Sequence, residues 1–205
     1  MKYRWYKKWF AARLADDPTS KFPSIISAKK EVFQTVSGKV LEIAAGTGVN
    51  MRFFPSSVSW YGLDPNPFGE KYASREAKKY GLRSFHYVVH TAEDLPFPDN
   101  TFDSVVATHA LCSVDNPHLV LSEIYRVLKP KGTFYFLEHV RSDRFLSRTI
   151  QYTVVPLFQL IADGCHPTRD TEKAIRTIPF RHISVRRFHA NIPVIGDHIV
   201  GTAVK

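Results

Sequence analysis

The sequence predicts an α/β fold built on a doubly wound, mostly parallel sheet. Short apolar runs rich in β-branched and aromatic residues alternate with amphipathic stretches of helical periodicity, which is typical of βαβ units. The runs are almost continuously apolar, as expected for parallel strands that are buried on both faces. The last quarter breaks this alternation, because two strand-like segments follow each other with no helix between them. We expect that pair to be antiparallel.

Each predicted strand is a run of β-forming residues that ends at a turn signal. The candidates for the parallel part are Val40–Ile43, Val58–Leu63, Phe85–Val89, Phe102–Ala107 and Thr133–Leu137. The two C-terminal candidates, His182–Phe188 and His198–Val204, are joined by a short loop that contains a proline and a glycine. We find no internal repeat, low-complexity tract or linker, so residues 1–205 are expected to form one domain.

Two of the predicted helices have clear boundaries. Asn116 is a cap-type residue directly before Pro117, and this pair is a helix-start signal. The apolar residues that follow share one helix face, and the helix is expected to end before Pro130. A second helix is predicted over residues 67–80, ending at Gly81, a residue common just after a helix.

Chain length and cysteine content indicate the cellular compartment in which the protein is expected. A chain of 205 residues can bury roughly 70% of its unfolded surface, so it needs no disulfide or metal to fold. Only Cys112 and Cys165 occur, and neither belongs to a Cys-x-x-Cys pair, so we expect a reduced, intracellular, cytoplasmic protein. No apolar run approaches the ~20 residues of a membrane span. The charged opening MKYRWYKKWFAARL is not expected to act as a signal peptide.

The formal net charge of +9 raises the question of an anionic partner. The basic residues are spread along the chain, with no arginine-rich or RNP-like stretch, so nucleic acid is not an expected partner. Local concentrations occur at the N-terminus and over residues 181–187. These suit an anionic membrane surface or a phosphate-bearing substrate.

The stretch VLEIAAGTG at residues 40–48 has the features of a cofactor-binding loop. Gly46 and Gly48 let the backbone approach a ligand, and a following helix N-terminus favours polar groups. A dinucleotide loop needs a third glycine where Met51 stands, and no P-loop lysine follows. Asp64 ends the next strand, twenty-two residues after Glu42, where a carboxylate can accept two ribose hydroxyls.

Four stretches, in order, resemble the class I S-adenosylmethionine (SAM)-dependent methyltransferases: VLEIAAGTG, YGLDPN, AEDLPFPDNTFDSVVA and SEIYRVLKPKGTFYFLEH. The resemblance implies an enzyme with a Rossmann-like, seven-stranded sheet whose last strand is reversed, and SAM as its cofactor. It places Glu42, Ala44, Gly46 and Gly48 beside the methionine part of SAM, Asp64 on the ribose, Pro65 and Asn66 beside the adenine, Ala92 and Glu93 along the adenine edge, and Thr108 and His109 on the methionine or substrate side.

Three positions depart from the family pattern. Ala44 replaces the first loop glycine, Thr91 stands where relatives often have an adenine-reading aspartate, and Lys131 replaces a turn glycine. If Ala44 is forced to positive φ, the cost is on the order of 1 kcal/mol; at ordinary φ its methyl group only narrows the loop.

Further short sequence motifs indicate the class of methyl acceptor. LCSV, FYFLEHV, DGCHPTRDTEKAI and the closing GTAVK resemble the methyltransferase-like family associated with alkyl thiol S-methylation at membranes. Length and layout are similar to small bacterial phospholipid N-methyltransferases, and LPFPDNTFD is similar to quinone and sterol C-methyltransferases. We expect a small hydrophobic acceptor, with a thiol favoured. A catalytically inactive SAM-binding module is the alternative of another class. The sequence does not indicate an oligomeric state.

Three residues are candidates for the catalytic group. His109 and His139 both follow predicted strands at their C-terminal ends, where ligands bind in open α/β sheets. Asp163, in IADGC, is the third. Each could remove a proton from the acceptor or position it, and each could instead be a structural histidine or a loop cap. No metal-spaced His/Cys set is seen, so no metal site is predicted.

Residues 1–22 form a basic aromatic N-terminal segment. Trp5, Trp9 and Phe10 are interleaved with the cations Lys2, Arg4, Lys7, Lys8 and Arg13. An aromatic helix face bordered by cations suits a helix at a membrane surface. The same aromatic face could instead form a lid over the acceptor pocket.

Overall fold

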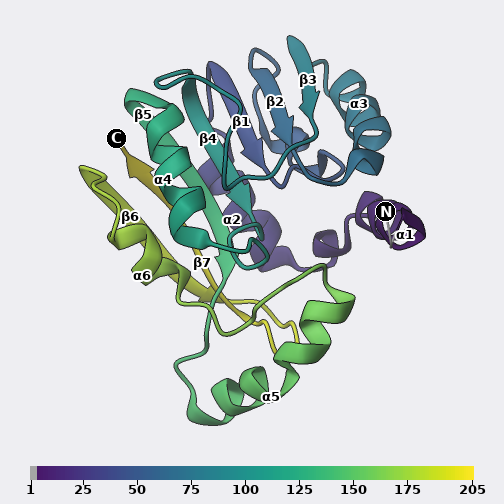
Figure 1. Ribbon diagram of the computed structural model, residues 1–205, viewed down its shortest axis with the longest axis vertical. Helices are drawn as coiled ribbons and strands as arrows, with labels where there is room; N and C mark the ends of the chain where they lie inside the picture. Colours follow the sequence, from purple (N-terminus) through teal and green to yellow (C-terminus); the bar gives the residue numbers. More distant parts are fainter. Residues whose placement is uncertain (1–3) are drawn as a thin grey trace.

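The computed structural model describes residues 4–205, in which helices flank one seven-stranded sheet on both faces (Figure 1). The strand order is β3-β2-β1-β4-β5-β7-β6. Parallel pairing joins β3, β2, β1, β4 and β5, whereas β7 runs antiparallel to both β5 and β6. The strands are β1 (Lys39–Ile43), β2 (Ser59–Leu63), β3 (Ser84–Val88), β4 (Phe102–Thr108), β5 (Leu128–His139), β6 (His182–His189) and β7 (Asp197–Val204). The predicted fold class, including the reversed last strand, is confirmed.

Six α-helices are described, together with three short 3-10 helices. The α-helices are α1 (Arg4–Ala15), α2 (Pro23–Phe33), α3 (Glu70–Lys79), α4 (Pro117–Val127), α5 (Phe145–Ile161) and α6 (Thr171–Arg176). The 3-10 helices are η1 (Pro18–Lys21), η2 (Val49–Phe53) and η3 (Pro67–Gly69). Of the basic N-terminal segment, Lys2 lies outside the described residues.

Each central strand contributes to two cores, one on either face of the sheet. On β5, Phe134 and Phe136 pack with α4 and α6, whereas Tyr135 and Leu137 pack with α2 and α3. Side chains alternate between the faces of a strand, so a strand buried on both faces must be apolar at successive positions. This explains the continuous apolar runs in the sequence.

The predicted start of α4 at Asn116-Pro117 and its predicted end before Pro130 are both confirmed. The Asn116 side chain accepts hydrogen bonds from the backbone N–H groups of His118 and Leu119, and Pro117 occupies the first turn. The helix ends at Val127, because the chain then enters β5.

Two local predictions differ from the structure. The helix expected to begin at Pro67 starts as η3, and α3 begins only at Glu70. Gly69 lies against the cofactor-type loop, where an added Cβ would be 2.1 Å from the carbonyl oxygen of Gly46, so this turn is held close to that loop. The expected helix after Gly48 is the short 3-10 helix η2.

Candidate functional site

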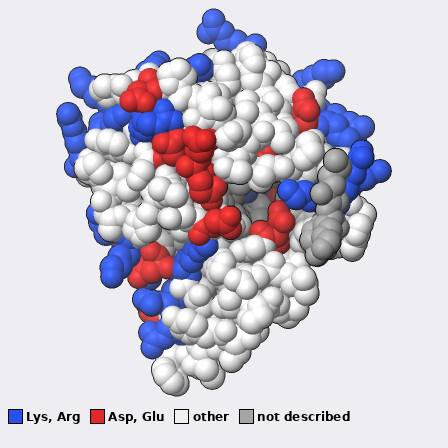
Figure 2. Space-filling view, in the orientation of Figure 1, with Lys and Arg blue, Asp and Glu red and all other residues white. Residues whose placement is uncertain are grey.

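The candidate site lies at the carboxyl ends of β1, β2 and β4. The strand order reverses between β1 and β4, and ligands of open α/β sheets bind at such a switch point. Helices α1 and α5 lie beyond this edge of the sheet (Figure 1). On the face of the molecule that Figure 2 shows, acidic side chains gather around a central hollow, while most cations lie towards the rim of that face.

The loop after β1 has the backbone conformation that the glycine pattern predicts. Gly46 and Gly48 have φ angles of 52° and 74°. A Cβ at Gly48 would lie 2.7 Å from the Met51 side chain and 3.1 Å from the Cα of Ala73, so this position has no room for a side chain. Ala44 also has a positive φ, 51°, and therefore pays the cost of about 1 kcal/mol expected for a non-glycine residue.

Asp64 is brought against this loop. Its Oδ2 accepts a hydrogen bond of 2.8 Å from the N–H of Gly46, and its Oδ1 accepts one of 2.7 Å from the N–H of Asn66. Burial raises the pKa of Asp64, while the two N–H donors oppose that rise. Pro65, which stands between Asp64 and Asn66 in the chain, is exposed. Asn66 is buried, and its side chain donates to the carbonyl oxygen of Lys7, which ties α1 to the site.

Glu42 is buried under the loop in a polar network that the sequence did not reveal. Its carboxylate accepts hydrogen bonds of 2.7 Å from Asn50 Nδ2 and from Trp60 Nε1. Asn50 also donates to Thr108 Oγ1 at 3.1 Å, so Glu42 and Thr108 share one partner. Burial raises the pKa of Glu42 to about 7, and burial lowers that of nearby Lys29 to about 8.

Ala92 and Glu93 lie between β3 and β4, next to the loop before α4. Ala92 is buried in the core. Glu93 Oε1 accepts hydrogen bonds from the N–H groups of Asp115 (2.9 Å) and Asn116 (3.5 Å), so it holds the loop before α4.

His109 directly follows β4 and faces a second histidine, His198, from β7. Its Nε2 lies 3.2 Å from Nε2 of His198, whose Nδ1 lies 2.9 Å from the carbonyl oxygen of Gly196. A carbonyl can only accept, so His198 carries its proton on Nδ1, and its Nε2 accepts from the Nε2–H of His109. The Nδ1 of His109 therefore bears a lone pair. Burial, followed by the charges of His198 and His139, holds the pKa of His109 well below 6.5.

His139 belongs to a different cluster, together with both cysteines. Its Nε2 lies 3.0 Å from Sγ of Cys165. One ligand-type atom from each of Cys112, His139 and Cys165 lies within 4.8 Å of the others, and all three residues are buried. The ring of His139 is 6.0 Å from that of His109, so the two predicted histidines are neighbours.

Asp163, the third candidate, lies next to α1. It is exposed, has a positive φ of 49°, and its N–H donates to the hydroxyl of Tyr6 at 3.3 Å. It borders an apolar pocket of about 620 Å³ between α1 and the end of α5, whose lining residues are Trp5, Tyr6, Lys7, Trp9, Gln159, Leu160, Ile161 and Asp163.

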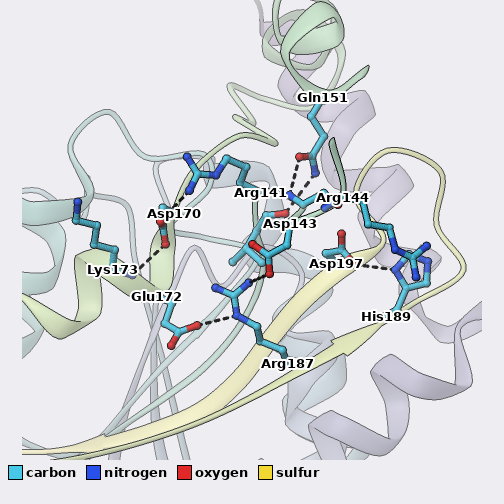
Figure 3. Close-up of polar contacts among 12 residues, drawn as sticks. Arg141, Asp143, Arg144, Gln151, Asp170, Glu172, Lys173, Arg187, His189 and Asp197 are labelled. Atoms are coloured by element: carbon cyan, nitrogen blue, oxygen red, sulfur yellow. Dashed lines mark hydrogen bonds and ion pairs between the residues drawn. The ribbon is translucent and has the colours of Figure 1, made fainter. Parts of the chain in front are cut away.

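A smaller polar pocket of about 260 Å³ lies behind His198, between β6 and the loop after β5. Three of its charged residues, Asp143, Arg187 and Asp197, form ion pairs (Figure 3). Arg187 binds Asp143 and Glu172, both at 2.9 Å, and His189 binds Asp197 at 2.8 Å. These pairs fasten the end of the reversed strand pair, which carries His198.

Comparisons with known proteins agree with this geometry. A family profile described as a methyltransferase domain matches residues 41–136. The chain is 34% identical to the human thiol S-methyltransferase TMT1A, over 97% of this chain and 87% of that protein. It is 37% identical to human TMT1B, over 87% and 79%. A phosphatidylethanolamine N-methyltransferase of Cereibacter sphaeroides is 27% identical over 69% of each chain.

Solved structures show the same fold. A methyltransferase in complex with the Haloferax volcanii Trm112 methyltransferase activator matches with a TM-score of 0.73 and 19% identity, over 97% of this chain and 96% of that chain. Bacillus subtilis YcgJ matches with a TM-score of 0.67, over 89% and 97%. The resemblance in the motifs is thereby confirmed: the protein is a SAM-dependent methyltransferase, and it belongs to the family of the thiol S-methyltransferases TMT1A and TMT1B.

Proposed function

We propose that this protein, as one domain of residues 1–205, methylates the sulfur atom of a small hydrophobic thiol. The observation that carries the proposal is the His109–His198 pair at the end of β4. It presents a neutral imidazole lone pair at the carboxyl end of β4, the strand that pairs with β1, and β1 leads into the cofactor loop. The relatives named as thiol S-methyltransferases support the same acceptor.

The residues of the cleft fit SAM. A carboxylate has about four lone-pair positions, and Asp64 uses two of them on backbone N–H groups, so two remain for ribose hydroxyls. The buried hydroxyl of Thr47 lacks a hydrogen-bond partner in the described part of the chain. We assign SAM binding to Glu42, Ala44, Gly46, Gly48, Asp64, Pro65, Asn66, Ala92, Glu93 and Thr108.

SAM supplies a methyl group bonded to a positively charged sulfur. The protein must hold the acceptor sulfur in line with that methyl group and take up the thiol proton. In this proposal the Nδ1 of His109 accepts the S–H hydrogen bond and so orients the thiol. His198 fixes the tautomer that makes this possible.

The apolar pocket between α1 and α5 supports a hydrophobic acceptor. Trp5, Trp9 and Leu160 line it and are 72%, 50% and 74% exposed, respectively. Helix α1 also reaches the cofactor loop, since a Cβ at Gly46 would lie 3.6 Å from Leu14. We therefore propose that α1 forms a lid over both the apolar pocket and the cofactor loop.

The surface of α5 supports contact with a membrane. Phe145 and Leu146 are 76% and 71% exposed, and Ile150, Leu157 and Ile161 add to the same apolar surface. The lower right of Figure 2, over α5, shows a surface that is mostly free of charged residues. No helix in residues 4–205 is long and apolar enough to cross a bilayer. We propose peripheral binding from the cytoplasmic side, because no disulfide joins the two cysteines, as expected in a reducing compartment.

Substituting His109 tests the proposal. Asparagine tolerates the positive φ of 50° at this position better than most residues, so His109→Asn removes the imidazole with little strain. We expect kcat for a hydrophobic thiol to fall at least about 100-fold, with SAM affinity unchanged. His118→Asn, at an exposed position on α4, serves as the matched control. Full thiol turnover by His109→Asn would contradict the assigned role.

A further inference from the structure

The cluster of Cys112, His139 and Cys165 is assembled from three separate segments. Cys112 follows β4, His139 is the last residue of β5, and Cys165 follows α5. Their exposed fractions are 1%, 2% and 6%, and their ligand-type atoms lie within 4.8 Å of one another. Two thiols and an imidazole therefore converge on one small buried volume.

We infer that Cys112, His139 and Cys165 bind a zinc ion. Thiolate and imidazole are the ligands that Zn²⁺ prefers, and Cys₂His is an established set for it. The charges also suit a metal. Two buried thiolates would be strongly disfavoured by themselves, whereas two thiolates and one Zn²⁺ are neutral together.

The backbone around the ligands is held in place by hydrogen bonds that join the three segments. Glu138 Oε1 accepts from the N–H groups of Ala110 (2.9 Å) and Leu111 (3.1 Å), which fixes the loop of Cys112 to β5. The carbonyl oxygen of Cys112 accepts from the N–H of His166 at 2.8 Å, which fixes the same loop to that of Cys165. These hydrogen bonds fix the segments that carry Cys112, His139 and Cys165 relative to one another.

Three protein ligands leave the fourth position of tetrahedral zinc open, as in catalytic rather than structural sites. We assign this position to the acceptor thiol, a step that rests on the proposed function. The cluster lies on the acceptor side, because the rings of His139 and His109 are 6.0 Å apart. The apolar pocket reaches Asp163, two residues before Cys165.

Zinc would solve a chemical difficulty of this site. Desolvation holds the pKa of His109 well below 6.5, so His109 cannot by itself keep a thiol ionised. A thiol on zinc loses its proton through His109 to solvent and stays a thiolate. Its sulfur lone pair then forms the bond to the methyl carbon, while the bond from that carbon to the sulfonium sulfur breaks and leaves its electron pair on that sulfur. The product thioether is a weaker zinc ligand and can leave.

Metal analysis of the purified full chain tests the zinc site. We expect about one zinc per chain. Cys112→Ser and Cys165→Ser should lose it, whereas His166→Ala, next to Cys165 but outside the ligand set, should keep it. Circular dichroism and a SAM titration show whether each variant is folded. Metal-free wild-type protein, or a Cys112–Cys165 disulfide in protein purified under reducing conditions, would overturn the inference.

Cobalt-substituted wild-type protein gives a second readout that needs no variant. Cobalt in this site should show sulfur-to-metal charge-transfer absorption and the visible bands of tetrahedral coordination. Adding a hydrophobic thiol without SAM should shift those bands, and an unchanged spectrum would contradict the open position. Because this titration involves no methyl transfer, it separates the two proposals: a thiol-responsive cobalt site in a protein that methylates only phospholipid would contradict the proposed function and leave the zinc site intact.

Discussion

Asp64 is the residue on which cofactor binding depends most directly, because it ties the loop after β1 to the turn after β2. Asp64→Ala removes that tie and both ribose acceptors. At about 1.5–3 kcal/mol for a charge-assisted hydrogen-bonding site, we expect SAM to bind at least tenfold more weakly in a calorimetric titration. Asp94→Ala, at an exposed carboxylate in the same region, should bind SAM normally. Equal affinities for the two variants would remove Asp64 from the site.

Ala44 is strained in the same loop, since its φ is 51°. Ala44→Gly should therefore bind SAM as well as the wild type or better, and should be equally stable or up to about 1 kcal/mol more stable in urea. Ala45→Gly is the matched control, because Ala45 is buried and does not have a positive φ, so glycine should destabilise there. A large loss of SAM affinity in Ala44→Gly would show that the loop does not cradle SAM as proposed.

His198 makes the stability of the protein depend on pH. Burial lowers its pKa from 6.5 to about 4, so its stabilising neutral form is fully present above pH 6.5 and is lost as the pH falls towards 4. This group alone should lower the free energy of unfolding by about 3 kcal/mol across that window. Urea unfolding at pH 7.5 and pH 5 measures the part of this change that falls above pH 5, about 2 kcal/mol. His198→Gln should lose less stability on acidification than the wild type, and an identical loss would contradict the assignment.

At the scale of elements, α5 places an apolar surface next to the pocket that α1 closes. Burying Phe145 and Leu146 in a lipid surface would contribute about 1.5–3 kcal/mol each. Phe145→Ser with Leu146→Ser should therefore weaken binding to anionic vesicles at least tenfold in a sedimentation assay, with SAM affinity unchanged. Thr149→Ala, at an exposed polar position of the same helix, is the control. Equal vesicle binding by both variants would show that α5 is not the contact surface.

For the whole molecule, the features that sequence predicts best are those set by local patterns. The apolar runs predict the buried strands because each must fill a core on both faces, and the missing helix before β7 predicts its reversal. The Asn116-Pro117 signal places the start of α4 because the cap bond is formed within three residues. The glycine loop and Asp64 come together because both end adjacent parallel strands.

Contacts between distant residues could not be predicted in this way. His198 gave no signal, because its partner His109 follows β4, which lies two places away from β7 in the sheet. Cys112 and Cys165 have no metal-type spacing, since β5 and α5 separate them in the chain. The turn at η3 depends on the approach of Gly69 to Gly46, which only the folded chain defines. The SAM-binding and catalytic roles predicted from the sequence, and the single-domain organisation, stay predictions.

The acceptor is tested most directly by a competition. The full chain is incubated with isotopically labelled SAM and equal amounts of a hydrophobic thiol, phosphatidylethanolamine and a quinol, and mass spectrometry measures where the labelled methyl group appears. We predict that it appears predominantly on sulfur, as the thioether, and that His109→Asn abolishes this product. Label on the phospholipid nitrogen or the quinol carbon, with the thiol unmodified, would contradict thiol S-methylation.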